Sequence, residues 1–139
     1  METVYRYTLT VAEANVDRNR HVNNIVYLQW MQDAAIQHAA HAGGTRLAEA
    51  LGSTWVVRTH RIEYFIPAFA GDKITVETWV ADFRRVRSLR RYRIVRARDG
   101  VLLAEGETDW VFVDAKTGRP RRIPEEMVRA FGLEDGGVT

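Results

Sequence analysis

The 139-residue chain contains no cysteine and only three prolines. The lack of thiols excludes a disulfide framework, a cysteine nucleophile and a thiolate-bound metal. The first residues lack the charged-then-apolar pattern of a secretion signal, and no apolar run approaches the roughly 18 residues that span a bilayer. We therefore expect a soluble, cytoplasmic protein with no membrane span. Apolar residues make up 46% of the chain, enough for one domain with a real core over residues 1–139.

Charge is nearly balanced, with a formal net value of +2, but its distribution is uneven. Lysine is almost absent, whereas arginine is abundant and concentrated in one stretch: Arg84, Arg85, Arg87, Arg90, Arg91, Arg93, Arg96 and Arg98. Basic strands of this kind favour an anionic partner. The alternative interpretation is a solvated basic face in an arginine-rich protein.

The N-terminal third predicts a strand followed by a long helix. Residues 3–12 are rich in Thr, Val and Tyr, as strands are. From Asn24 onward, apolar residues recur at steps of three and four, the helical period. Asn23 suits the N-cap, and Gly43-Gly44 supplies a stop. The second half of this helix is rich in alanine, which allows close packing, so we expect the helix to be largely buried.

The rest of the chain predicts a short helix and then four strands. The helix covers residues 45–51, and the strands cover residues 54–66, 73–83, 89–98 and 102–112. Asp99-Gly100 is a strong hairpin signal between the last two strands. One strand, a long helix and four consecutive strands indicate an α+β fold, with the helix on a mostly antiparallel sheet.

A cluster of polar residues, Asp17 to Asn24, directly precedes the long helix. It combines a carboxylate, an imidazole and several amides. The first N–H groups of a helix have no internal partners and lie at the positive end of the helix dipole. This position suits an oxyanion, such as the one that forms when a thioester carbonyl is attacked.

The run from Asp17 to Leu28 resembles the D-x-x-x-H-V-N-N-x-x-Y-L pattern of hotdog-fold acyl thioesterases, close to the 4-hydroxybenzoyl-CoA thioesterase and YbgC-like families. The stretch His60-Arg61-Ile62-Glu63-Tyr64, with Gly71-Asp72 and the strands that follow, also matches what those families place after their helix. The spacing of Asp17, Asn19 and His21 is similar to the D-x-N-x-H run of plant acyl-ACP thioesterases. The resemblance implies the hotdog fold, in which a sheet wraps a long central helix, and hydrolysis of acyl-CoA or acyl-ACP thioesters.

The resemblance also implies roles for individual residues. Asp17 corresponds to the catalytic carboxylate, which attacks the thioester or activates water; the sequence leaves both routes open. The N–H of Asn24 would stabilise the oxyanion, and Asn19 and His21 would orient or polarise the thioester. A structural role for either of the last two is equally consistent. Tyr27 belongs to the substrate-binding candidates, although a packing role also fits it.

Coenzyme A carries phosphates that arginine binds well. The resemblance makes Arg85, Arg87, Ser88 and Arg90 candidates for holding the nucleotide. It also implies a homodimer or homotetramer joined at sheet edges, which an exposed edge favours. We expect no cofactor and no metal site, because the histidines lack suitable acidic neighbours.

Three other functions compete with thioester hydrolysis. A non-catalytic acyl-CoA-binding module would need no reactive carboxylate, yet Asp17 is present. Nucleic-acid binding would use the arginines, but stacking aromatics are not interleaved with them, so we expect no nucleic-acid partner. A hotdog dehydratase would need a histidine and a carboxylate placed for proton abstraction, which the motif fits less well.

Overall fold

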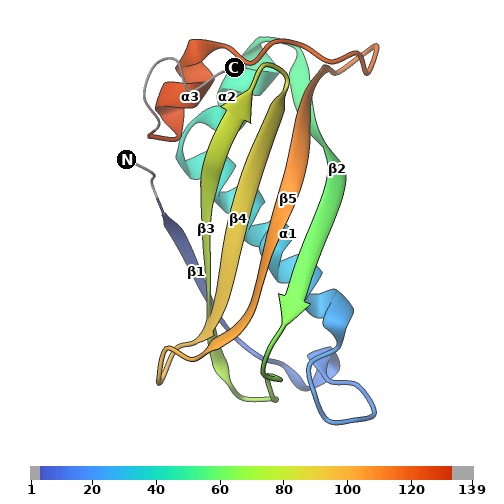
Figure 1. Ribbon diagram of the computed structural model, residues 1–139, viewed down its shortest axis with the longest axis vertical. Coiled ribbons are helices and arrows are strands. Elements are labelled where there is room, and N and C mark those ends of the chain that lie inside the picture. The colour runs from blue at the N-terminus through green and yellow to red at the C-terminus, as the bar shows by residue number, and fades with distance from the viewer. Residues whose placement is uncertain (1–3, 133–139) are drawn as a thin grey trace.

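The computed structural model describes residues 4–132 (Figure 1). Along the chain the elements are β1 (Tyr5–Thr10), the 3-10 turn η1 (Glu13–Asn15), α1 (Asn24–His41), α2 (Gly44–Ala50), β2 (Ser53–Tyr64), β3 (Lys73–Arg84), β4 (Arg87–Arg96), β5 (Leu102–Asp114) and α3 (Glu125–Ala130). The predicted order of strand, long helix, short helix and four strands is therefore confirmed. Neither η1 nor α3 was anticipated from the sequence.

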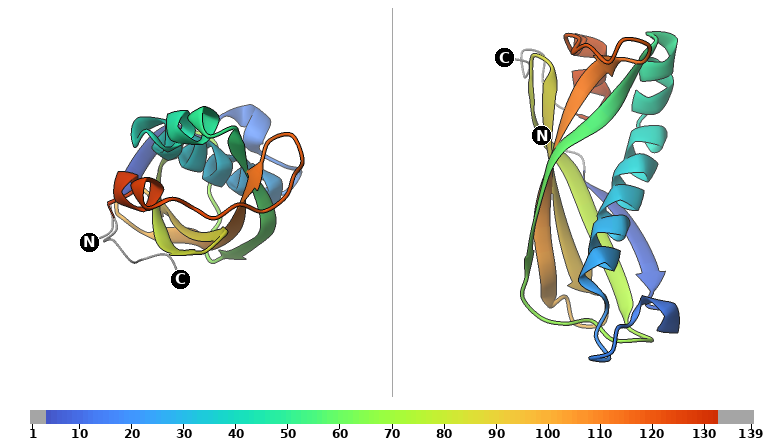
Figure 2. Two further views of the ribbon diagram at one scale, coloured as in Figure 1. Left: turned by 90° about the horizontal axis from the view of Figure 1, so that it is seen from above. Right: turned by 90° about the vertical axis from the view of Figure 1, so that its right-hand side faces the viewer.

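The five strands form one sheet in the order β1-β3-β4-β5-β2. Every neighbouring pair is antiparallel. The sheet curves around α1, which lies along its concave face, as the two views of Figure 2 show. Strands β1 and β2 form its edges, so within residues 4–132 one side of the 12-residue β2 has no strand beside it.

Helix α1 starts and stops where the sequence indicates. The side chain of Asn23 accepts a hydrogen bond from the Ile25 N–H at 3.0 Å, as an N-cap does. The helix ends before Gly43, whose positive φ of 86° suits a residue without a side chain. No helix among residues 4–132 is long and apolar enough to cross a membrane.

Only one face of α1 is buried, which corrects the expectation that the helix is largely enclosed. The buried side chains face the sheet: Tyr27, Trp30, Met31, Ala34, Ala35 and His38. On the opposite face, Ile25 is 66% and Ile36 is 62% exposed. The sheet covers the helix from one side only, so the far face of α1 stays open in the single chain.

Gly106 in β5 lies directly against the Met31 side chain of α1. A Cβ atom at this position would lie 2.9 Å from Cε of Met31 and 2.6 Å from the Arg61 carbonyl oxygen. Both distances are shorter than the 3.0 Å below which a Cβ atom essentially never lies from another heavy atom, so glycine is the residue that fits without a shift. The close approach seats the middle of α1 in the curve of the sheet.

A second apolar cluster closes the end of the fold near the α1 C-terminus. Helix α3 contributes Met127 and Val128, and Phe131 follows it. They pack against Ala48 of α2 and Phe83 of β3. This cluster shapes the cavity described below.

Candidate active site at the start of helix α1

A tight loop presents the polar motif just ahead of α1. Val16 and Val22 form an isolated antiparallel bridge. Between them, the N–H of Asp17 donates to the His21 carbonyl at 2.9 Å, and the N–H of Arg20 donates to the Asp17 carbonyl at 3.0 Å. Arg20 adopts a left-handed backbone conformation, with φ of 68°. Backbone bonds thus fix the loop and leave its side chains available.

The carboxylate of Asp17 is exposed and partly engaged. Its Oδ1 accepts a hydrogen bond from the Asn19 N–H at 2.8 Å, forming an Asx turn. Its other oxygen has no hydrogen bond from residues 4–132. One oxygen therefore orients the group, and the other can act on a substrate or a water molecule.

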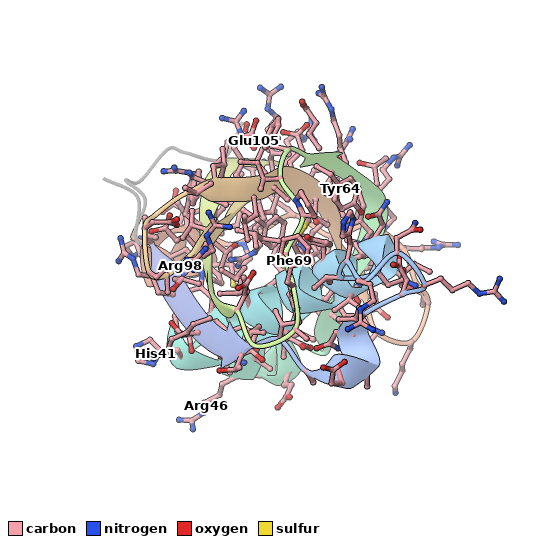
Figure 3. All side chains as sticks on the ribbon, turned by 90° about the horizontal axis from the view of Figure 1, so that it is seen from below. His41, Arg46, Tyr64, Phe69, Arg98 and Glu105 are labelled. Carbon is pink, nitrogen blue, oxygen red and sulfur yellow. The ribbon has the colours of Figure 1, made fainter. Side chains whose placement is uncertain are left out.

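Asn24 is the first residue of α1, and within the described chain its N–H has no acceptor. Its carbonyl oxygen accepts a hydrogen bond from the Tyr64 hydroxyl at 2.9 Å. Figure 3 shows Tyr64 at the end of β2, beside the start of α1. The free N–H and the adjacent Asp17 loop form a place where an oxyanion can be held next to a carboxylate.

Of the other motif residues, His21 and Asn19 are exposed, whereas Tyr27 is buried. The ring of His21 meets the edge of Phe69, with centroids 5.3 Å apart. The hydroxyl of Tyr27 accepts a hydrogen bond from the Ala68 N–H at 3.1 Å. Burial raises the pKa of this phenol, so it stays neutral. Tyr27 therefore supports the loop that carries Ala68.

The arginines of β4 lie mostly in ion pairs on the outer face of the sheet. Arg87 is paired with Asp109, and Arg91 lies 3.7 Å from Glu107. Arg85, at the β3–β4 turn, is exposed and has no side-chain hydrogen bond or ion pair within residues 4–132. The charges of the exposed β4 arginines are therefore largely neutralised by ion pairs. Arg85, in the turn before β4, has no such partner within residues 4–132.

Ser88 and Arg90 lie in the interior, each 4% exposed. They face α1 and α3 from the concave side of the sheet, whereas Arg87 faces outward. The four predicted nucleotide-binding residues, Arg85, Arg87, Ser88 and Arg90, therefore divide into two exposed and two interior side chains.

The histidines do not converge. His38 bonds Arg90, His60 bonds Thr108 at 2.8 Å, and His41 is exposed. No group of three potential metal-ligating side chains occurs within the described part of the chain.

The Asp17 loop and the β3–β4 turn lie at opposite ends of the sheet (Figure 1). The N–H of Val22 bonds the Ala68 carbonyl, just before the start of β3, whereas Arg85 follows its end. Twelve strand residues separate the two ends, a distance of roughly 35 Å. One chain therefore does not bring Arg85 to Asp17.

Comparison with known proteins identifies the family. The model of the thioesterase-like superfamily matches residues 11–131. The chain belongs to this superfamily. It is 33% identical over 131 residues to the L-carnitine dehydrogenase/betainyl-CoA thioesterase of Agrobacterium fabrum, covering 90% of this chain and 27% of that protein. The chain thus spans only part of that relative.

Two further comparisons cover most of this chain. It is 26% identical over 132 residues to the acyl-CoA thioester hydrolase YbgC of Escherichia coli, covering 93% of this chain and 96% of that protein. The structure of a putative oleoyl thioesterase from Lactobacillus plantarum superposes with a TM-score of 0.88 at 20% identity, covering 99% of this chain and 53% of that one. The hotdog fold is confirmed, and the family supports thioester hydrolysis.

The sequence identified the motif but not all of its partners. Tyr64 belongs to the segment that resembles the hotdog thioesterases, yet no local sequence pattern indicates that its hydroxyl bonds the Asn24 carbonyl. The pairing of Arg90 with His38 joins residues 52 positions apart, and no spacing rule indicates it.

Proposed function

We propose that the protein hydrolyses acyl thioesters of coenzyme A or of acyl carrier protein, with Asp17 as the catalytic carboxylate. One observation carries this proposal. In a chain of the thioesterase-like superfamily, the loop that leads into a helix carries an exposed, oriented carboxylate seven residues before the free N–H of the helix start. These are the two groups that attack on a thioester carbonyl requires.

The reaction adds water across the thioester and yields a carboxylic acid and a thiol. Asp17 either removes a proton from the attacking water and returns it to the thiolate as the C–S bond breaks, or attacks the carbonyl carbon itself. The direct attack expels the thiolate and gives an anhydride, which water then opens. In both routes the carbonyl oxygen becomes an oxyanion, which the Asn24 N–H stabilises. Loss of one such donor typically raises the barrier by about 2.7–4 kcal/mol. Asn19 and His21, exposed on the same loop, orient the thioester.

We further propose that two copies pair through β2. This edge strand is long, has no strand on its outer side, and carries exposed Val56 and Val57. The far face of α1 adds Ile36, also exposed. Such an edge favours pairing with another chain. Antiparallel pairing of two β2 strands would extend the sheet and set the β3–β4 end of one copy beside the Asp17 end of the other.

Pairing of this kind explains why the two predicted halves of the site lie far apart in one chain. Arg85 of one copy, with Arg87 beside it on the turn, would approach the substrate at the Asp17 end of the other. Arginine suits the phosphates of coenzyme A because its planar donors match their oxygens. Ser88 and Arg90 are left out of this proposed nucleotide-binding group because both side chains lie in the interior.

The test of the reaction is thiol release from short, medium, long and aromatic acyl-CoA and acyl-ACP thioesters. We expect Asp17→Asn to lower kcat by at least about 100-fold, with the Asx turn and the fold retained. Asp33→Asn is the control, since Asp33 is an exposed carboxylate in the middle of α1. Hydrolysis at the wild-type rate by Asp17→Asn contradicts the mechanism. Binding of acyl-CoA by the wild-type protein with no hydrolysis of any thioester indicates a binding module instead.

The test of the nucleotide contact compares each CoA thioester with the N-acetylcysteamine thioester of the same acyl group. Arg85→Ala should raise KM for the CoA ester only. Arg98→Ala is the control, because Arg98 lies on the side of the molecule away from Tyr64 (Figure 3). An equal effect of Arg85→Ala on both esters contradicts the contact.

A further inference from the structure

A cavity of about 340 Å³ lies between the C-terminal half of α1 and the sheet. Most of its wall is apolar, formed by Ala35, Ala39, Trp55, Val80, Phe83 and Phe131. No residue of the Asp17 loop lines it. Its volume is at the small end of the range for ligand pockets, about 300–1,000 Å³, so it suits a small, largely apolar molecule.

Arg90 places a positive charge in the wall of this cavity. One guanidinium nitrogen, Nη1, donates to Nδ1 of His38 at 2.8 Å and to the Thr78 hydroxyl at 3.1 Å. The guanidinium also lies over the ring of Phe131, 5.6 Å from its centroid. The other two guanidinium nitrogens, Nε and Nη2, make no hydrogen bond with residues 4–132. Neither is fully shielded from solvent, so both remain accessible to a ligand.

No acidic group compensates this charge. Among the described residues, no carboxylate lies within 4.0 Å of Arg90. Glu49 also lines the cavity, but it is exposed and makes no ion pair with Arg90. The imidazole, the hydroxyl and the phenyl ring that contact the guanidinium all lack negative charge. The nearby Tyr92 phenol is also neutral, because burial raises its pKa. A buried ion is expected to be paired, because burial removes its hydration.

His38 adds a donor and no negative charge. Burial, the charge of Arg90 and His41 together lower the pKa of His38 to about 4. The imidazole is therefore neutral near pH 7. Because its Nδ1 accepts from Arg90, its proton lies on Nε2, which is buried without a partner. The cluster of Arg90, His38 and Thr78 thus holds an excess of donors around one unpaired cation.

We propose that this cavity binds a small organic carboxylate, whose oxygens pair with Nε and Nη2 of Arg90 and whose apolar body packs against Phe83 and Trp55. Two parallel N–H groups of arginine match the two oxygens of a carboxylate. The Ser88 hydroxyl, in the same wall, offers a further donor. A single cation in an apolar chamber favours a singly charged carboxylate over a phosphate or a nucleotide.

The carboxylate can come from two sources. It can be the distal carboxylate of an acyl group bound as a thioester, or it can be a free carboxylic acid such as a released product. Ala35 and Ala39 of α1 line the cavity. At a rise of 1.5 Å per residue, this part of the helix lies roughly 20 Å from Asn24 of the same chain. A ligand held on Arg90 is therefore separate from the reacting bond at Asp17 of the same chain.

Direct binding tests the proposal without use of the thioesterase reaction. Trp55 and Trp110 both line the cavity, so tryptophan fluorescence can report binding, with calorimetry to confirm it. The probes are octanoate and octanamide, which differ in charge and little in size. At neutral pH we expect octanoate to bind at least about tenfold more tightly than octanamide.

Arg90→Met should remove this preference while retaining the volume of the side chain. Arg91→Met is the matched control, because the next residue of β4 faces outward and pairs with Glu107. Equal binding of octanoate and octanamide by the wild-type protein, or no binding of either, overturns the proposal even if Arg90→Met does not fold. A preference that survives in a folded Arg90→Met variant overturns it as well.

Hydrolysis of suberyl-CoA and octanoyl-CoA then separates the two sources. A faster, Arg90-dependent reaction of the suberyl ester supports a distal carboxylate on the acyl group. Octanoate binding that depends on Arg90, with equal hydrolysis of the two esters, supports a free-acid site. Since binding is measured by itself, a protein that hydrolyses no thioester can still bind octanoate, and the two proposals fail independently.

Discussion

Tyr64 donates a hydrogen bond of 2.9 Å to the carbonyl oxygen of Asn24, which ties the end of β2 to the first residue of α1. The peptide N–H of the same residue is the one proposed to stabilise the oxyanion. The ring of Tyr64 also meets the edge of the Tyr27 ring, with centroids 5.2 Å apart. The edge strand and the helix start are therefore held together by one side chain.

Tyr64→Phe tests this connection. The variant keeps the ring contact and loses only the hydrogen bond, so we expect the free energy of unfolding to fall by about 0.5–1.5 kcal/mol. We also expect kcat to fall, because the first residue of α1, which carries the N–H donor, is held less firmly. Urea unfolding and thiol release measure the two effects. Tyr7→Phe is the control, since the Tyr7 hydroxyl makes no hydrogen bond within residues 4–132. No change in either quantity would contradict the role of Tyr64.

Val57→Lys tests pairing through β2. A charge placed on the exposed edge strand should oppose the approach of a second strand. We expect light scattering after gel filtration to show a monomer, and turnover to fall with it. Thr8→Lys places the same charge on β1, the other edge, and should leave mass and turnover unchanged. A Val57→Lys variant with the mass and activity of the wild-type protein would argue against this interface.

Stability should depend on pH through His38. Burial is the main cause that lowers the pKa of His38 from 6.5 to about 4, so between these values the unfolded chain binds more protons than the folded protein. The free energy of unfolding therefore falls as the pH drops from about 6.5 towards 4. His38→Gln should weaken this dependence strongly, whereas His41→Gln should weaken it only slightly, because His41 is the smallest of the three causes that lower the pKa of His38. Urea unfolding at several pH values gives the slopes, and identical slopes for His38→Gln and the wild-type protein would contradict the assignment.

Gly106→Ala should destabilise the protein by about 1–3 kcal/mol, the usual cost of overpacking. The added methyl group meets Met31 and the Arg61 carbonyl, and backbone cannot move aside as a flexible side chain can. Chemical unfolding measures the change. Glu105→Ala, on the outer face beside it, should stay within about 0.5 kcal/mol of the wild-type protein. A neutral Gly106→Ala variant would show that α1 can shift away from the sheet.

The structural features that can be predicted from the sequence are those determined by residues close together in the chain. Asn23 caps α1 through the N–H two residues later, and Gly100 turns the β4–β5 hairpin with φ of 72°. A short pattern suffices for such features. The bond between Tyr64 and Asn24 and the bond between Arg90 and His38 depend on how α1 lies in the sheet. Arg87 and Arg90 are three residues apart in β4, so they face opposite sides of the sheet. Which of the two sides is the interior depends on the position of α1.

The distance between Asp17 and Arg85 along the sheet has a consequence for mixtures of variants. If the site forms between two copies through β2, an Asp17→Asn chain still offers its arginine turn and an Arg85→Ala chain still offers its carboxylate. Some pairs that combine the two chains would then hold one complete site. Two preparations, each impaired by itself, would recover part of their activity when they are unfolded together and refolded as a mixture. Such complementation between defective copies is the behaviour of a catalytic unit shared by two chains.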